Sequence, residues 1–388
     1  MIYSEYQGLK LSKLGFGAMR LPVLEDGSID AAQTEAMVDL AMQAGVNYYD
    51  TAWPYHGGKS ELVLGQALKK YPRESFYLAT KFPGHQIMPR YDVKATFERQ
   101  LEKCGVEYFD FYLLHNVYEK SIATYEDERW GILPYLLEQK KNGRIRHLGF
   151  STHAGLPALE SFLEKHAAEM DFCQIELNYL DWTLQQAKEK VELLNRYNVP
   201  IWVMEPVRGG KLAKLPENAH AQLQALRPDT SDASWGFRFV QDIPGVTVIL
   251  SGMSDLAQVR DNLHTFESPA PLSDHERETL LQIAELFKDT VPCTACRYCC
   301  DGCPQQIDIP NMIRVLNELR VAPTTNAVMA IEALPESQQP KSCLACGACA
   351  AVCPQKIDIP ACMEELAGRI AKPPSWAEIS RQRAAEQP

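Results

Sequence analysis

Short apolar runs of β-prone residues recur at regular intervals up to Gly252, and a segment with helical periodicity separates each run from the next. The eight expected strands are Leu14–Met19, Val46–Ala52, Phe76–Phe82, Phe109–His115, His147–His153, Phe172–Tyr179, Pro200–Val207 and Val246–Gly252. Runs that are apolar along almost their whole length are typical of parallel strands buried on both faces. Eight strands that alternate with helices close naturally into a (β/α)8 barrel of the TIM type. An open doubly wound sheet would usually have fewer strands and an early glycine-rich fingerprint, which the sequence lacks.

The helical segments have recognisable ends. Asp30 is the expected N-cap of a helix over Ala31–Ala44, and Gly45 suits the left-handed conformation that ends a helix. The same signals predict helix starts at Ser60, Asp92 and Asp229 and helix stops at Gly105 and Gly143. The segment from Tyr3 to Leu11 is compatible with an opening hairpin.

Ten of the twelve cysteines lie between Cys293 and Cys362, and eight of them form two copies of one pattern. Each copy reads C-x2-C-x2-C-x3-C-P, and both continue with the same Gln-x-Ile-Asp-Ile-Pro segment. Thiolates at this spacing hold three corners of a [4Fe–4S] cluster, while the fourth cysteine reaches the neighbouring cluster. The predicted ligands are Cys293, Cys296, Cys299 and Cys353 for one cluster, and Cys343, Cys346, Cys349 and Cys303 for the other. This segment resembles the bacterial two-cluster ferredoxins, with an insertion between the halves.

Two alternatives bear on these cysteines. Cys300 adjoins Cys299 and could compete as a ligand, but the second copy has Ala350 at the corresponding position, so we assign Cys299. Pairs of the C-x2-C type also bind zinc, but a zinc site gives no reason for a third cysteine and a following proline in both copies.

The length of the chain, 388 residues, exceeds what one ordinary core holds, and two domains are expected. We expect a barrel over residues 1–272, a linker helix over 273–291, and a small α+β ferredoxin-like domain with a C-terminal tail over 292–388.

The net charge of −11 argues against nucleic acid and anionic membrane surfaces as partners, because both repel an acidic protein. The longest apolar runs have the length of strands, and the first residues lack the pattern of an export signal. A cytoplasmic location is therefore the expectation.

Four residues at predicted strand ends form a set that can handle protons. Asp50 ends the second strand, Tyr55 follows in the next loop, Lys81 ends the third strand and His115 the fourth. Reactive groups of such barrels lie at the carboxyl ends of the strands. A phenol has a pKa of about 10 and needs help to exchange protons near neutrality. Lys81 would favour the phenolate, Asp50 would hold Lys81, and His115 would bind the substrate oxygen or relay the proton.

At these residues the sequence resembles the aldo-keto reductase family. The similar stretch is Asp50-Thr51-Ala52-Trp53-Pro54-Tyr55, followed by Ser60-Glu61 and Leu64-Gly65, and the resemblance extends from Leu11 to Asn262. It implies hydride transfer between a nicotinamide cofactor and a carbonyl or alcohol substrate, with Tyr55 as general acid in reduction. It also implies that Ser151, Thr152 and Gln174 bind the carboxamide of the cofactor.

The remaining predicted cofactor residues are Glu205, Ser251, Gln258 and Asn262, and here the sequence departs from the family. Met204 stands where many members have an aromatic residue to stack on the nicotinamide. Gln258 and Gly252 stand where NADP-specific relatives carry Arg and Lys, although Arg208 and Arg260 are nearby. Guanidinium and ammonium groups are what attracts a 2′-phosphate, so the choice between NAD and NADP stays open.

Two functional hypotheses follow. In the first, the barrel interconverts a carbonyl and an alcohol, and the clusters exchange electrons with a partner protein. A nicotinamide moves two electrons as hydride whereas a cluster moves one, so direct exchange would need a flavin in part of the cofactor slot. In the second, the cluster domain is a structural or redox-sensing module that docks a partner, and the barrel works without it.

Overall fold

The computed structural model describes residues 1–86, 90–287, 289–321, 331 and 334–371. The chain divides into two compact units, Met1–Ala284 and Glu285–Pro388. Helix α12 (Asp274–Glu285), most of the segment expected as a linker, is grouped by its contacts with the first unit. The expected C-terminal tail falls almost wholly in residues 372–388, outside the described part.

The first unit is a closed barrel of eight parallel strands in the order β10-β3-β4-β5-β6-β7-β8-β9. The strands are β3 (Leu14–Gly17), β4 (Tyr48–Asp50), β5 (Tyr77–Phe82), β6 (Phe109–Leu114), β7 (Ile145–Thr152), β8 (Cys173–Glu176), β9 (Ile201–Met204) and β10 (Val246–Gly252). Each lies within or largely overlaps one of the eight predicted runs. The predicted barrel is therefore confirmed.

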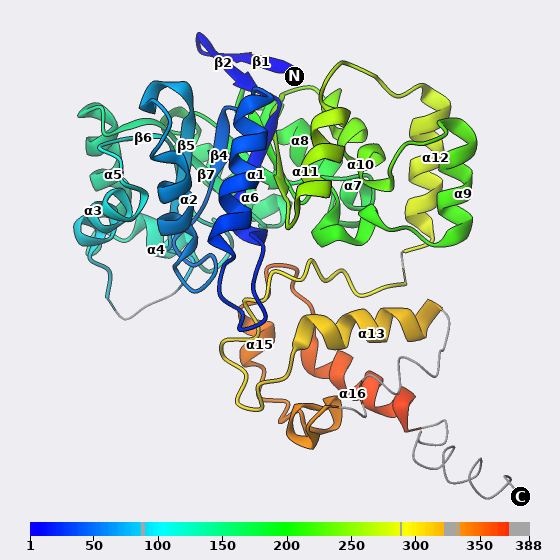
Figure 1. Cartoon of the computed structure of the whole chain (residues 1–388). Helices are drawn as coiled ribbons and strands as arrows, with labels where there is room; N and C mark the ends of the chain where they lie inside the picture. Colours follow the sequence, from blue (N-terminus) through cyan, green and yellow to red (C-terminus); the bar gives the residue numbers. More distant parts are fainter. Residues whose placement is uncertain (87–89, 288, 322–330, 332–333, 372–388) are drawn as a thin grey trace, which may run out of the picture. The chain divides into compact units, whose positions relative to one another are not determined.

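Helices surround the strands (Figure 1). They are α1 (Ala31–Gln43), α2 (Ser60–Leu68), α3 (Val93–Cys104), α4 (Ile122–Glu126), α5 (Ile132–Lys141), α6 (Leu156–His166), α7 (Asp181–Leu184), α8 (Ala187–Arg196), α9 (Glu217–Leu226), α10 (Asp232–Gln241) and α11 (Leu256–Thr265), followed by α12. None of the helices in the described part of the chain is both long enough and apolar enough to pass through a bilayer.

The predicted helix ends are partly right. Asp30 and Asp92 cap α1 and α3, since each carboxylate accepts a bond from a backbone N–H three residues on. Gly105 ends α3 in the left-handed conformation. Ser60 and Asp229 are not caps: the Ser60 hydroxyl bonds Ala18 O instead, and Ser231 caps α10. Ser60 does not act as an N-cap because its hydroxyl donates to the buried carbonyl oxygen of Ala18.

The expected opening hairpin is present as β1 (Tyr3–Tyr6) and β2 (Leu9–Ser12), at one end of the barrel (Figure 1). Tyr6 packs its ring edge-on against Trp202 of β9, with 5.0 Å between centroids. Tyr6 and Leu11 belong to the same buried cluster as the inward residues of the strands. The hairpin thus fills the amino-terminal end of the lumen, and the carboxyl-terminal end holds the polar strand ends.

The second unit is built around two helices that follow the two cysteine motifs, α13 (Ile309–Val321) and α16 (Ile359–Ile370). They pack on each other through a shared apolar cluster, and Arg320 Nε of α13 lies 3.0 Å from Glu365 Oε1 of α16. Asp358 caps α16 by accepting from Ala361 N, and Asp308 accepts from Asn311 N at the start of α13. The described regular elements of this unit are α13, α16, α15 (Ala348–Ala351) and two 3-10 turns, so the β part of the expected α+β domain does not appear there as strands.

Candidate active site

The two-residue period of the strands decides which side chains face the mouth of the barrel. Tyr48, Ala79 and Leu113 belong to the buried cluster that fills the lumen. Because alternate residues of a strand point to the same side, the residues two positions later also face inward. Those residues are Asp50, Lys81 and His115. The strands thus place three of the four predicted proton-handling side chains at one end of the lumen.

Asp50 and Lys81 form a buried ion pair. Lys81 Nζ lies 2.6 Å from Asp50 Oδ1 and 2.8 Å from Thr51 O, and both side chains are almost fully buried. Burial lowers the pKa of Lys81, and the charge of Asp50 acts against that shift. Burial also raises the pKa of Asp50, and Lys81 acts against it. Each charge therefore opposes the effect of burial on its partner without cancelling it, so the pKa of Lys81 lies below and that of Asp50 above its ordinary value.

Tyr55 lies in the loop after β4, where its backbone N–H donates to Ala52 O in a turn. Its ring centroid is 5.0 Å from Lys81 Nζ and 5.8 Å from the ring centroid of His115, edge-on. The structure therefore brings together all four residues that the sequence singled out. Their arrangement suits a phenol that passes a proton beside a cation.

His115 is fixed by its backbone. Its N–H donates to Phe82 O, and its carbonyl accepts from the Tyr125 hydroxyl at 2.7 Å. Burial lowers the pKa of His115 well below its usual value, with smaller contributions from the charges of His85 and Lys81. The imidazole is therefore neutral, and it suits hydrogen bonding to a carbonyl oxygen.

Sequence reasoning missed His85, in the loop after β5. Its ring centroid lies 4.2 Å from that of His115. Burial, with help from the charge of His153, lowers the pKa of His85 to about 3. A second neutral imidazole therefore borders the mouth.

The predicted carboxamide site is only partly open to a ligand. Gln174 is buried and faces the lumen on β8, and its Oε1 has no hydrogen-bond partner among the described residues. Its Nε2 faces Met204 Sδ at 3.6 Å. Ser151 Oγ accepts from Asn116 N, and the Thr152 hydroxyl bonds Val117 O and Ala154 N. Gln174 is thus the member of this set that offers a buried acceptor, while the Thr152 hydroxyl is engaged by the loops after β6 and β7.

The other predicted cofactor residues bond one another or their neighbours. Ser251 Oγ accepts from Asn262 Nδ2 at 2.8 Å, and Gln258 bonds Ser254 N and Asp255. Glu205 forms an ion pair with Arg20 at 3.0 Å.

Sequence reasoning also missed Arg20, which follows the first barrel strand. Its side chain packs beside Gly252, where an added Cβ would meet it at 3.2 Å. Arg20 therefore lies beside the Ser251–Ser254 segment, whereas Arg208 is buried elsewhere. Arg20 could have been predicted as a site residue from the sequence, because it directly follows the first predicted barrel strand, Leu14–Met19.

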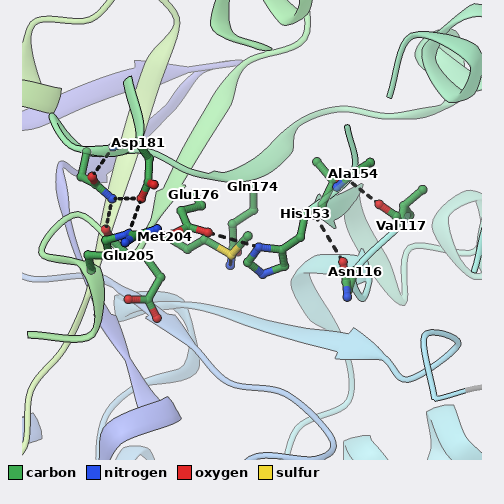
Figure 2. Close-up of polar contacts among 12 residues, drawn as sticks. Asn116, Val117, His153, Ala154, Gln174, Glu176, Asp181, Met204 and Glu205 are labelled. Atoms are coloured by element: carbon green, nitrogen blue, oxygen red, sulfur yellow. Dashed lines mark hydrogen bonds and ion pairs between the residues drawn. The ribbon is translucent and has the colours of Figure 1, made fainter. Parts of the chain in front are cut away.

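A second charged group lies at the ends of β7, β8 and β9 (Figure 2). His153 Nδ1 is 3.4 Å from Glu176 Oε2, and Glu176 Oε1 is 3.7 Å from Arg208 Nε. Arg208 Nε also donates to Asp181 Oδ2 at 2.8 Å. All but His153 are less than one-tenth exposed. Glu176 could have been predicted from the sequence, because it is two residues after Gln174 and hence on the same side of its strand.

Eight cysteines of the second unit line two cavities. One is lined by Cys293, Cys296, Cys299 and Cys353, and the other by Cys303, Cys343, Cys346 and Cys349. Each cavity thus combines three cysteines of one motif with the last cysteine of the other, which is the predicted exchange. Cys300 lines neither cavity.

Zinc is the alternative interpretation of these cysteine pairs. A zinc ion holds its sulfur ligands at about 2.3 Å, so the side chains must converge on one point. Within the described residues, no three His, Cys, Asp or Glu side chains converge in this way.

Comparisons with known proteins agree with both parts. The profile described as "Aldo/keto reductase family" matches residues 13–285, and that of the "4Fe-4S dicluster domain" matches residues 292–357. A probable aldo-keto reductase of soybean is 29% identical over 58% of this chain, a match that spans 66% of the soybean protein. The 9,11-endoperoxide prostaglandin H2 reductase of Trypanosoma cruzi is 26% identical over 73% of the chain and 90% of its own length.

Solved structures show the same fold. The holo form of an aldo-keto reductase from Bacillus halodurans superposes with a TM-score of 0.59 at 24% identity, covering 73% of this chain and 96% of that one. An aldo/keto reductase of Klebsiella pneumoniae in complex with NADP and acetate gives a TM-score of 0.59 at 19% identity, over 73% of this chain and 93% of its own.

Proposed function

The chain belongs to the aldo/keto reductase family, and we propose that its barrel reduces a small carbonyl compound with Tyr55 as the proton donor. The observation that carries the proposal is the contact between Tyr55 and the buried Lys81–Asp50 pair. A cation beside the phenol stabilises the negative charge that develops when the proton leaves. The neutral His115, edge-on to Tyr55, positions the carbonyl oxygen that receives the proton.

The cofactor proposed for the barrel is NADP or NAD. Gln174 Oε1 fits a carboxamide, because it is a buried acceptor without a partner in the described part of the chain and an amide N–H satisfies such an acceptor. A bound reduced nicotinamide supplies the hydride that adds to the carbonyl carbon. Tyr55 gives its proton to the carbonyl oxygen, so that an alcohol and the oxidised cofactor result. Ser151, Thr152, Glu205, Ser251, Gln258 and Asn262 remain the proposed neighbours of the cofactor.

The names of relatives support a carbonyl or alcohol substrate. One relative is an NADH-specific methylglyoxal reductase of Escherichia coli, 25% identical over 53% of this chain. Another is the L-galactose dehydrogenase of Arabidopsis thaliana, 32% identical over 39% of the chain. The Klebsiella structure holds NADP.

For the second unit we propose two [4Fe–4S] clusters, held by the two sets of four cysteines. The donor set fits, since thiolates are the ligands of such clusters and both cavities present four. The clusters would supply transfer of single electrons to or from a partner protein. A flavin is the group that would connect the transfer of single electrons to the transfer of a hydride.

The test of the barrel proposal is Tyr55→Phe. This variant removes one hydroxyl and should lower kcat/KM for aldehyde reduction by about 10²-fold or more, as expected for the loss of a general acid. Nicotinamide binding, followed by protein fluorescence, should change little. Tyr71→Phe is the matched control, because that phenol bonds Asp39 on the outside of the barrel. Undiminished turnover in Tyr55→Phe would refute the assignment of the acid.

A further inference from the structure

We propose that His153, oriented by Glu176, is a specificity residue that hydrogen-bonds a hydroxyl on the carbon next to the reacting carbonyl. The inference rests on the proposed carbonyl reduction and adds to it a substrate class, the α-hydroxy aldehydes and ketones. His153 takes no part in bond making on this account, and Glu176 is a positioning residue.

Strand register places His153 at the mouth. Thr152 of β7 is level with Ile175 of β8, so the next residues, His153 and Glu176, lie side by side at the strand ends. Ser151 and Gln174, two residues earlier on the same side, are level with each other as well. These four side chains form a patch on the lumen side, in which Ser151 and Gln174 belong to the predicted carboxamide site.

The neighbouring strand brings His115 into the same space. Strand β6 pairs with β7, and Leu114 is level with Phe150, so His115 lies one strand away from His153 and slightly deeper. Besides burial, the charge of His153 is among the causes that lower the pKa of His85 and of His115. The His153 ring is therefore within electrostatic reach of the group proposed to hold the carbonyl oxygen.

His153 is also the accessible member of this lining. Its side chain is 17% exposed, whereas that of Glu176 is 6% exposed and that of Lys81 is fully buried. Of the four side chains in the patch, that of His153 is therefore the most accessible to a ligand at the mouth of the barrel.

A buried network fixes the orientation of the ring. Glu176 faces His153 with one oxygen and Arg208 with the other. Arg208 is held in turn by Asp181, which accepts from Asn178 Nδ2 at 2.7 Å. Burial alone would raise the pKa of Glu176, but the hydrogen bond with His153 and the charge of Arg208 lower it overall. An ionised carboxylate beside an imidazole sets its tautomer and direction.

The charges of this network favour a neutral substituent on the substrate. The Arg208 cation faces two carboxyl groups, Glu176 and Asp181, so the group as a whole offers no surplus positive charge. A substrate carboxylate would meet the negative charge of Glu176. A hydroxyl meets no such repulsion, and it can donate to or accept from an imidazole.

The experiment compares two aldehydes that differ by one group, 2-hydroxypropanal and propanal. Each is reduced to its alcohol by hydride addition at the carbonyl carbon and proton transfer from Tyr55, so 2-hydroxypropanal yields a 1,2-diol. The quantity measured is the ratio of kcat/KM for the hydroxylated to the plain aldehyde, with whichever of NADPH and NADH supports turnover. Dividing the ratio of a variant by that of the wild type cancels the intrinsic difference in reactivity.

We expect His153→Leu to lower this ratio by about tenfold or more, through KM and kcat for 2-hydroxypropanal, while propanal reduction is nearly unchanged. Glu176→Gln should lower the ratio in the same direction by a smaller factor. His166→Leu is the control, since that histidine is similarly buried, with 15% of its side chain exposed, and bonds Glu169 at 2.8 Å on the outside of the barrel. Its ratio should equal that of the wild type.

The outcomes separate the two proposals. If wild type and His153→Leu give the same ratio, or if both aldehydes slow equally in the variant, His153 has a structural role and this inference is wrong while carbonyl reduction stands. If the wild type reduces neither aldehyde with either nucleotide, the proposed function fails and the inference fails with it.

Discussion

At the scale of single residues, the rule that reactive groups lie at carboxyl ends of barrel strands predicted where Asp50, Lys81 and His115 would meet. The rule works because the two-residue period of a strand and the closure of the barrel fix which side chains point into the lumen at the carboxyl ends of the strands. It did not reveal the contacts of Arg20, Glu176 or Arg208. Those contacts depend on the register between neighbouring strands and on side-chain directions, which a single sequence does not encode locally.

The ion pair of Lys81 and Asp50 gives the residue-scale prediction. Lys81→Met should lower the free energy of unfolding by about 3–5 kcal/mol, because it leaves a buried carboxyl without its partner. The double variant Asp50→Asn/Lys81→Met removes both charges and should regain much of that stability without regaining carbonyl reduction. Urea denaturation and kcat/KM for propanal measure the two effects. Activity that returned together with stability would show that Lys81 has only a structural role.

At the scale of elements, apolar runs predicted all eight strands, since buried parallel strands leave a strong signal. Helix ends were harder to predict. Ser60 looks like an N-cap in sequence, yet its hydroxyl bonds Ala18 O and Thr51 Oγ1 inside the barrel wall. A tertiary partner decides between such alternatives, and local sequence cannot show it.

Helix α12 gives the prediction at this scale, because Glu276 ties it to Arg227 just after α9, with Arg227 Nη2 2.7 Å from Glu276 Oε2. Hydrogen bonding to Arg227 lowers the pKa of Glu276 to about 2, from an ordinary value of 4.5. A lowered carboxyl pKa stabilises the fold above pH 4.5, and this contribution is lost as the pH falls from 4.5 toward 2. Glu276→Gln should therefore cost about 1 kcal/mol near neutrality, since the pair is partly exposed, and less at pH values of about 3.

Urea denaturation across this pH range measures the difference between Glu276→Gln and the wild type. Glu267→Gln is the control, because that carboxylate is 74% exposed and 3.6 Å from its partner His264. A stability difference for Glu276→Gln that did not shrink on acidification would contradict the role given to the ion pair.

At the scale of the whole molecule, the clustering of the cysteines and the repeat of one cysteine motif predicted an iron–sulfur domain after the barrel, and the matched profiles agree. The position of helix α12 was less predictable. The sequence predicted a linker helix over residues 273–291, and the contacts of α12 group it as far as Ala284 with the barrel unit. The sequence of a helix beside the start of the cysteine-rich domain does not show which of the two hydrophobic cores the helix packs on.

The two units should respond separately to loss of a cluster ligand. Cys296→Ala should reduce iron content by about half, because each cavity draws on its own set of four cysteines. The barrel should stay folded and keep reducing propanal. Cys300→Ala is the control, because Cys300 lies beside Cys299 but lines neither cavity. This variant should retain all of the iron. Loss of barrel structure in Cys296→Ala would show instead that the cluster unit supports the barrel.

The central step of the proposed function is direct hydride transfer at the mouth of the barrel. It is tested by single turnover under anaerobic conditions with propanal and a reduced nicotinamide deuterated at one face of C4, followed by mass spectrometry of the propanol. Direct hydride transfer should place one deuterium on the carbinol carbon with one of the two deuterated faces and none with the other. Propanol formed without deuterium from either face would mean that electrons and protons arrive by separate routes, which would rule out direct hydride transfer.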